Sequence, residues 1–241
     1  MIAPTGMILP HERVLVGIDT TDCDKAVGIA NAVAGSVGGV KLGKEFFVSN
    51  GPEGVRCVTA GGAPLFLDLK WHDIPNTVAG AVRASLPLKP LIVNVHASGG
   101  PAMMRAAAEA AAAAGTDRPM VIGVTVLTSM AEDDLAAVGQ DTDMQAQVAR
   151  LAKLAMECGL DGVVCSPKEI RLVKQACGPD FKCIVPGIRP VWSAANDQKR
   201  IATPSQAVLD GADYIVIGRP IAAAEDPANA AKRVAEELEA A

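Results

Sequence analysis

Short runs of apolar and β-branched residues recur along the chain, and Ala-rich stretches separate them. The runs predict eight strands, at residues 14–19, 39–43, 64–70, 91–97, 120–127, 162–166, 182–188 and 214–218. The stretches between them are long enough for helices, for example at 22–35, 101–114, 143–158 and 225–240. Regular alternation of strands and helices predicts a parallel sheet with right-handed crossover connections.

Local signals mark where several helices start. The segments 166–169 (SPKE) and 203–206 (TPSQ) read as capping boxes with proline at the first helical position. Thr142 to Gln145 reads as a third capping box. These signals support the division of the chain into strand–helix units.

The number of units decides between two architectures. No low-complexity linker or change of composition divides the chain, so residues 1–241 are expected to form one domain. Eight units in 241 residues favour a single (β/α)8 TIM barrel, which typically needs about 250 residues. The alternative is a doubly wound open sheet, which usually has fewer strands. Its usual Gly-rich first turn is missing, because no GxGxxG motif follows the first strand.

Composition narrows the range of partners. The chain has 22 Lys+Arg and 27 Asp+Glu, for a formal net charge of −5. A nucleic-acid surface would need clustered basic residues and usually aromatic platforms, yet there are only four Phe, two Trp and one Tyr. We therefore expect no nucleic-acid partner.

Cysteine usage and the N-terminal sequence predict a cytoplasmic protein. The six cysteines form no CxxC pair and no zinc-like grouping with the three histidines. The start MIAPTGMILPHER lacks the basic and apolar regions of a secretory signal. No uncharged apolar stretch reaches about 18 residues, so we expect no membrane span.

Polar residues follow most of the predicted strands at the same end. In a barrel of this type, the carboxyl ends of the strands meet at one mouth, where the active site lies. The strand-end residues are Asp19, Lys41, Asp68, Lys70, His96, Thr128, Ser129, Ser166, Arg189, Gly218 and Arg219. Their common placement predicts an active site at this mouth without naming a reaction.

The third strand carries the most informative pair of charges. Side chains alternate between the two faces of a strand, so Phe66, Asp68 and Lys70 share one face and three leucines share the other. The leucines suit the layer beneath the helices, which turns Asp68 and Lys70 into the barrel. With Lys41 and Asp73, they would form an alternating Lys–Asp–Lys–Asp array that keeps an ammonium charged and ready to donate a proton. A purely structural buried ion pair is the alternative.

Asp73 and Thr77 allow two interpretations. Asp73 precedes Ile74 and Pro75, so it could either cap the third helix or take part in catalysis. Thr77 follows four residues later, on the same face of the first helical turn, and could contact the same ligand.

The last two predicted strands lead into a candidate phosphate site. TIM barrels commonly bind phosphate after strands 7 and 8, where this chain has Arg189, Gly218 and Arg219. Arg219 can pair with a dianion in a bidentate manner, and Gly218 lets the backbone approach closely. The polar segment 190–203 predicts a lid, from which Gln198 could donate to the phosphate.

His96 ends the fourth predicted strand and raises the question of a metal. No HxH or HExxH motif accompanies it, and no second strand-end histidine is present. These features favour a packing or hydrogen-bonding histidine over a metal ligand. We expect no metal site.

A longer string identifies a family resemblance. FLDLKWHDIPNT at 66–77 closely resembles the signature of the orotidine 5′-phosphate decarboxylase family. Further matching strings follow in the same order along the chain: LVGID (15–19), VKLGKE (40–45), NVHASGG (94–100), VTVLTSM (124–130), DGVVCS (161–166), PGIRP (186–190) and DYIVIGRP (213–220). The resemblance implies a TIM barrel that converts orotidine 5′-phosphate to UMP and CO2 without a cofactor, in pyrimidine biosynthesis.

The same resemblance implies roles for the candidate residues. It implies that Lys70 donates the proton within the charged array. It also implies a homodimer, in which Asp73 and Thr77 reach the active site of the other subunit. The remaining implied contacts are Asp19 and Lys41 to the ribose, Thr128 and Ser129 to the pyrimidine, and Arg189, Gln198, Gly218 and Arg219 to the phosphate.

Three other functions compete with this one. A Mg²⁺-dependent sugar-phosphate decarboxylase or synthase of the keto-gulonate-phosphate type shares the DxK motif, but it would be expected to carry an acidic metal ligand where this chain has Lys41. A Schiff-base aldolase would use Lys41 or Lys70. A catalytically silent nucleotide-binding dimer would have no reason to keep the inward-facing charges.

Overall fold

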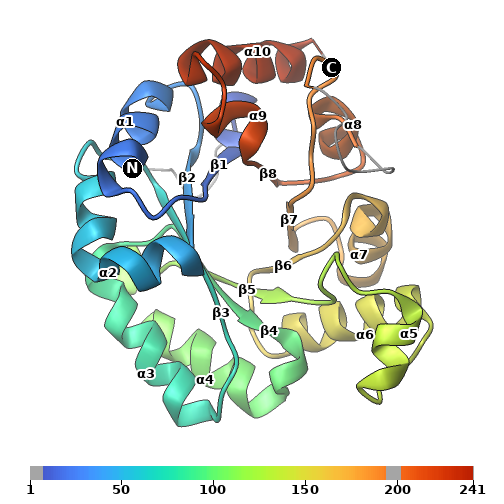
Figure 1. Cartoon of the computed structure of the whole chain (residues 1–241). Coiled ribbons are helices and arrows are strands. Elements are labelled where there is room, and N and C mark those ends of the chain that lie inside the picture. The colour runs from blue at the N-terminus through green and yellow to red at the C-terminus, as the bar shows by residue number, and fades with distance from the viewer. Residues whose placement is uncertain (1–7, 194–201, 241) are drawn as a thin grey trace.

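Eight parallel strands close into a barrel in sequence order (Figure 1). The computed structural model describes residues 8–193 and 202–240. The strands are β1 (Val14–Ile18), β2 (Gly39–Gly43), β3 (Leu65–Trp71), β4 (Ile92–His96), β5 (Met120–Val124), β6 (Gly162–Val164), β7 (Lys182–Val185) and β8 (Tyr214–Ile217). Since β8 pairs with β1 in parallel, the sheet has no free edge. The predicted (β/α)8 barrel is confirmed, and the open doubly wound sheet is wrong.

The helices surround the barrel, as Figure 1 shows. They are α1 (Cys23–Val33), α2 (Lys44–Thr59), α3 (Pro75–Ser85), α4 (Pro101–Ala112), α5 (Glu132–Ala137), α6 (Met144–Glu157), α7 (Ile170–Cys177), α8 (Pro204–Leu209), α9 (Arg219–Ala222) and α10 (Pro227–Glu239). α2 is kinked at Gly51, whose φ of 60° is left-handed and which precedes Pro52. Within the described ranges, every helix is too short or too polar to cross a bilayer.

Two of the predicted helix starts illustrate the precision of capping signals. The Thr203 hydroxyl accepts a hydrogen bond from the backbone N–H of Gln206 at 3.1 Å, as the sequence predicts. The predicted start at Thr142 is wrong by one residue. The Asp143 carboxylate caps α6 instead, because Asp143 has extended backbone angles and accepts from the N–H of Ala146 at 3.0 Å.

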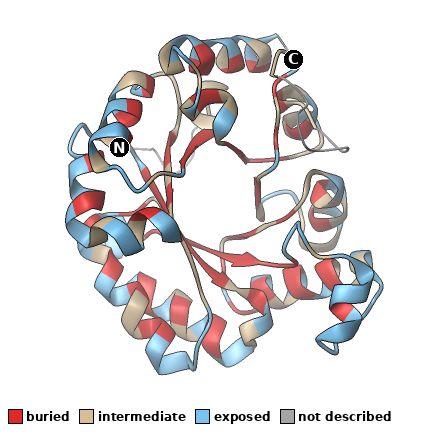
Figure 2. Ribbon diagram, viewed as in Figure 1, coloured by how far each residue is buried: buried red, intermediate tan, exposed pale blue. Residues whose placement is uncertain are grey.

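The strands of the barrel are largely buried (Figure 2), and two apolar layers pack against them, one inside and one outside the barrel. The inner layer consists of Leu15, Phe66, Ile92, Ile122, Ile184, Tyr214 and Val216. Alternate strand residues, such as Val14 and Val16, face outward against the helices. Side chains therefore fill the barrel interior, and polar groups have room only near the ends of the strands.

β5 and β7 each end three residues before the end of the apolar run that predicts them. β5 ends at Val124, and the hydroxyl of the next residue, Thr125, donates to the carbonyl of Val164 at 3.0 Å. β7 ends at Val185, and Ile188 instead forms an isolated parallel bridge with Ala202. Both segments stay apolar because they line the mouth of the barrel, not because they remain in the sheet.

All six cysteines are free thiols. Cys158, Cys165 and Cys183 are buried in the apolar layer, where a thiol packs as a small hydrophobic group. Their burial accounts for the placement of cysteines inside apolar sequence stretches.

Candidate active site

Four of the predicted site residues meet at the carboxyl ends of β1, β2 and β3. The Lys41 Nζ lies 3.3 Å from Asp19 Oδ1 and 3.5 Å from Asp68 Oδ2. The Lys70 Nζ lies 2.5 Å from the other carboxylate oxygen, Asp68 Oδ1. We call Asp19, Lys41, Asp68 and Lys70 the charged cluster. Alternating signs let each charge offset its neighbours in a partly dehydrated place.

Asp68 is the centre of the charged cluster. Its exposed fraction is only 9 %, and its two oxygens contact both ammonium groups. Burial alone would raise the pKa of Asp68, but the positive charges of Lys41 and Lys70 outweigh it and the pKa is lowered below its usual value. Asp68 is therefore an anion at neutral pH, although it is buried.

A glycine on the neighbouring strand makes room for Lys41. Gly17 pairs with Lys41 in the sheet, and both face the barrel interior. A Cβ at Gly17 would lie 3.2 Å from Lys41 Cε and 3.4 Å from Gly218 Cα. The close approach of β1, β2 and the end of β8 thus depends on a missing side chain.

Sequence reasoning missed Asn94, which completes the surroundings of Asp68. Its Nδ2 donates to Asp68 Oδ1 at 2.6 Å, and its Oδ1 accepts from the backbone N–H of Lys70 at 2.7 Å. Asn94 is fully buried on β4. One signal in the sequence could have found it: a polar amide stands at an inward position between Ile92 and His96 in an otherwise apolar run.

Among the described residues, Asp73 and Thr77 form no ion pair or hydrogen bond with the charged cluster. Both are exposed, and the Asp73 carboxylate accepts a hydrogen bond from the adjacent N–H of Ile74 at 2.6 Å. The N-cap residue of α3 is Ile74, with no side-chain cap, so the capping interpretation of Asp73 is wrong. Among the residues that the structure describes, Asp73 has no ion pair with Lys70, so the four-membered array is not assembled within one chain.

His96 lies beside the charged cluster at the end of β4. Its ring centroid is 5.5 Å from that of His72. Burial, together with the nearby His72, Lys44 and Lys70, lowers the pKa of His96 from 6.5 to about 4. The imidazole is therefore neutral at physiological pH. Within residues 8–193 and 202–240, no cluster of three or more His, Cys, Asp or Glu side chains could hold a metal ion.

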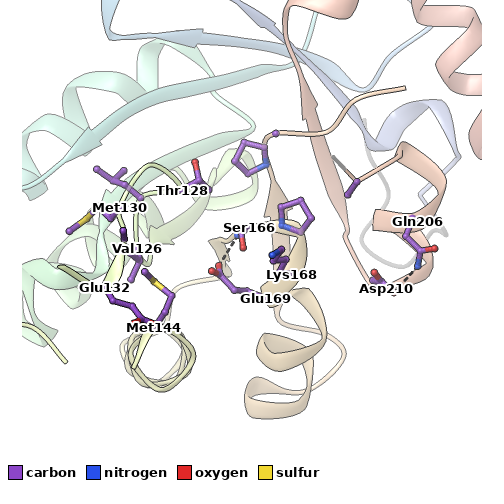
Figure 3. A pocket seen from close by; sticks show the side chains of 16 residues that line it. Val126, Thr128, Met130, Glu132, Met144, Ser166, Lys168, Glu169, Gln206 and Asp210 are labelled. Carbon is purple, nitrogen blue, oxygen red and sulfur yellow. Dashed lines mark hydrogen bonds between the residues drawn. The ribbon is translucent and has the colours of Figure 1, made fainter. Parts of the chain in front are cut away.

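A cavity of about 940 Å³ opens at the carboxyl ends of β5, β6 and β7 (Figure 3). Thr128, Ser166 and Gly187 line it from the segments that follow these three strands, and Gln206 lines it from α8. The carboxylate of Glu169 accepts a hydrogen bond from the backbone N–H of Ser166 at 2.8 Å, which holds the β6 loop as the predicted capping box requires. Such a volume suits a ligand the size of a nucleotide.

Thr128 and Ser129 lie differently with respect to this cavity. Both are exposed after β5, but only Thr128 is among the residues that line it.

The ends of β7 and β8 carry the predicted phosphate residues. Arg189 follows β7 and is fixed by a hydrogen bond from its backbone N–H to the carbonyl of Ala202 at 3.0 Å. Gly218 lies beside the charged cluster, because a Cβ there would be 3.9 Å from Asp19 Oδ2. Arg219 is exposed at the first position of α9. Gln198 lies outside the described residues.

The start of the predicted lid is anchored to the last helix. Of residues 190–203, only 190–193 and 202–203 are described. The guanidinium of Arg233 on α10 stacks over the Trp192 ring at 4.2 Å from its centroid. This cation–π contact ties the segment after β7 to the helical layer.

The whole barrel is similar to proteins of one known family. Residues 12–234 match the profile of the orotidine 5′-phosphate decarboxylase / HUMPS family. The chain belongs to this family. An orotidine 5′-phosphate decarboxylase of Rhodospirillum rubrum is 55 % identical over 235 residues, covering 95 % of each chain. Another, of Moorella thermoacetica, is 48 % identical over 240 residues and covers 97 % of this chain and 95 % of the relative.

A solved structure of the family agrees with the fold. The crystal structure of orotidine 5′-phosphate decarboxylase from Lactobacillus acidophilus superposes with a TM-score of 0.84 at 36 % identity, covering 93 % of this chain and 98 % of that one. The barrel and its order of strands are therefore those of the orotidine 5′-phosphate decarboxylase / HUMPS family.

Proposed function

We propose that this protein is an orotidine 5′-phosphate decarboxylase that converts orotidine 5′-phosphate to UMP and CO2 in pyrimidine biosynthesis. The charged cluster carries the proposal: a buried anion, Asp68, lies between two ammonium groups at the mouth of the barrel. The names of the relatives and of the solved structures support it.

The geometry suggests how the reaction proceeds. Loss of CO2 breaks the bond between C6 and the carboxylate and leaves the electron pair on C6, where the ring provides no conjugated sink. Fixed charges must therefore stabilise the carbanion. The Lys70 ammonium would stabilise the charge at C6 and then protonate it, while Asp68 would face the departing carboxylate. All the groups that this mechanism needs belong to the protein, so no cofactor is required.

Contacts remote from C6 would bind and orient the substrate. Asp19 and Lys41 would hold the ribose hydroxyls, and Thr128 and Ser129 would lie near the pyrimidine. The phosphate would be bound by Arg189, Gly218 and Arg219, which follow β7 and β8, and by Gln198 of the predicted lid. Binding energy from these contacts would align the ring with Lys70 and close the segment 190–203.

A homodimer would complete the site. Asp73 and Thr77 are exposed, and among the described residues Asp73 makes no ion pair with Lys70, so both are available to the active site of a partner subunit. We place the enzyme in the cytoplasm.

The Mg²⁺-dependent sugar-phosphate alternative is disfavoured by Lys41. Its ammonium lies 3.3 Å from Asp19 and 3.5 Å from Asp68. It therefore takes the position between the two carboxylates that a divalent cation would have to occupy. A positive charge there repels a metal ion. Activity should therefore be unchanged by EDTA.

A substitution of Lys70 tests the proposal. Lys70→Ala should abolish the absorbance change that accompanies loss of orotidine 5′-phosphate, while UMP still binds as an inhibitor, because the phosphate and ribose contacts remain. Lys182→Ala is the matched control: Lys182 also pairs with a buried aspartate, Asp213, at 3.1 Å, but at the amino end of the barrel. Near-normal kcat in Lys70→Ala, or no turnover by the wild-type protein, would contradict the proposal.

A further inference from the structure

β3 is irregular directly opposite Asn94. Leu67 pairs with Val93 and Trp71 pairs with Val95, so residues 68–70 of β3 face a single residue of β4. Within this bulge, Lys70 has a φ of 51°, a left-handed conformation that a lysine rarely adopts. A bulge of this kind redirects a side chain near an active site, and here it brings Lys70 back onto Asp68.

The amide of Asn94 holds both ends of the bulge. It donates to the side chain of Asp68 at 2.6 Å and accepts from the backbone N–H of Lys70 at 2.7 Å. A residue at this place must provide one donor and one acceptor at the same time, which a carboxylate or an apolar side chain does not. Asn94 is fully buried, so water does not compete for either bond.

We infer that Asn94 is a positioning residue for the decarboxylation. It orients the carboxylate of Asp68 and fixes the backbone of Lys70, so that the ammonium and the carboxylate keep their places relative to the reacting carbon. Asn94 acts through these two residues and does not touch the substrate itself. The inference rests on the function proposed above.

The charged groups around Asn94 determine how the activity of a variant at this position depends on pH. Asp68 and Lys70 face it from β3, Lys41 approaches the same carboxylate from β2, and His96 follows it on its own strand. On the other side, β5 presents Ile122, which is not titratable. Asp68 is thus the group that a new carboxyl at position 94 would meet.

Asn94→Asp uses this environment as a test. The new carboxyl would lie against Asp68, and two such groups share one proton, which raises the pKa of the pair. With the proton in place, an O–H replaces the lost N–H donor; without it, two anions repel. At pH 8 the kcat of Asn94→Asp should therefore be about 30-fold below that of the wild type. At pH 6 this difference should shrink about 10-fold, to about 3-fold. The KM for orotidine 5′-phosphate should stay within about 3-fold.

Asn94→Ala removes the amide without adding a charge. It should lower kcat about 30-fold at every pH, with no recovery in acid and with an unchanged inhibition constant for UMP. Ser85→Ala is the matched control, because Ser85 is also buried and donates one hydrogen bond, to the carbonyl of Val82 at 2.7 Å, on α3. It should lower the melting temperature but leave kcat and its pH profile unchanged. Each kcat is calculated per mole of enzyme that binds UMP, so that unfolded protein does not count as inactive enzyme.

The outcomes separate this inference from the proposed function. Acid recovery in Asn94→Asp alone, with KM preserved in both variants, supports the positioning role. Wild-type kcat in Asn94→Ala, equal losses at all pH values in both variants, or failure of both to fold would overturn it. In each of these cases the wild-type enzyme still decarboxylates orotidine 5′-phosphate. Absence of that activity in the wild type would instead refute the proposed function, and the positioning role with it.

Discussion

Replacing Asp68 by Asn tests whether the charged cluster stabilises the fold as well as the reaction. The substitution keeps the shape of the side chain and removes the negative charge that Lys41 and Lys70 share. Lys41 keeps its contact with Asp19 at 3.3 Å, but the described residues offer Lys70 no other carboxylate. Each ammonium contacts a different oxygen of Asp68, and in the asparagine one of these oxygens becomes an NH2 group, which donates and cannot accept from the lysine beside it.

The structure sets the size of the effect. At an effective dielectric constant of about 20, the attraction between Lys41 and Asp68 at 3.5 Å is about 5 kcal/mol before desolvation is subtracted. The side chain of Lys70 is 26 % exposed, so water partly solvates its charge once Asp68 is neutral. The loss of folding free energy should therefore lie at the lower end of the range for a buried ion pair that loses one partner. We expect Asp68→Asn to lower the free energy of unfolding by about 3 kcal/mol. The melting temperature should fall by about 6–12 °C.

Urea denaturation of Asp68→Asn and wild type between pH 8 and pH 5 measures this loss. Because the pKa of Asp68 is lowered below 3.8, its carboxylate stays ionised over this whole range. Its stabilising contribution is present above the pKa of the unfolded chain and is lost only as the pH falls through the lower folded pKa. The difference between the two proteins should therefore be constant from pH 8 to pH 5.

Asp213→Asn is the matched control for activity. Asp213 is as little exposed as Asp68, at 9 %, and binds Lys174 at 2.7 Å and Lys182 at 3.1 Å. It directly precedes β8, at the end of the barrel opposite the site. Asp213→Asn should cost similar stability but retain kcat, whereas Asp68→Asn should lose about 100-fold in kcat.

Two results would refute this reasoning. If Asp68→Asn is as stable as wild type, the lysines do not outweigh the cost of burying the carboxylate. If the stability difference shrinks between pH 7 and pH 5, the carboxyl takes up a proton in that range and its pKa is raised, not lowered.

Two further substitutions address neighbouring parts of the site. Because the pKa of folded His96 is about 4 against an ordinary 6.5, the unfolded chain binds a proton first as the pH falls, and His96 destabilises the fold between these values. His96→Asn should remove this destabilisation, which is about 1 kcal/mol at pH 5 after allowance for the partial exposure of the ring. Between pH 7.5 and pH 5, the melting temperature of His96→Asn should therefore fall about 2–4 °C less than that of the wild type. Equal falls in the two proteins would contradict this expectation. Arg219→Ala should raise the KM for orotidine 5′-phosphate about 10- to 100-fold, and Arg219→Lys should restore it only in part, since a lysine keeps the charge but not the bidentate geometry; an unchanged KM would remove Arg219 from the phosphate site.

The order of elements and the inward direction of Asp68 followed from the sequence alone. Strand–helix alternation is a local pattern, and a parallel sheet of eight such units has few ways to bury both faces. The alternation of side chains along β3 likewise predicted that Asp68 turns into the barrel. Lys70 reaches Asp68 through the bulge at 68–70 instead, where its φ of 51° interrupts the regular alternation. Both predictions needed only the periodicity of a strand and the cost of exposing apolar residues.

Tertiary structure decided how the charges are held. Asn94 is 26 positions from Asp68 in the sequence, and no local pattern relates an amide on β4 to a bulge on β3. The space that Gly17 leaves for Lys41 likewise depends on the register of β1 and β2. Contacts between strands depend on which residues the closed barrel brings opposite one another, and the pattern within one strand does not contain that information.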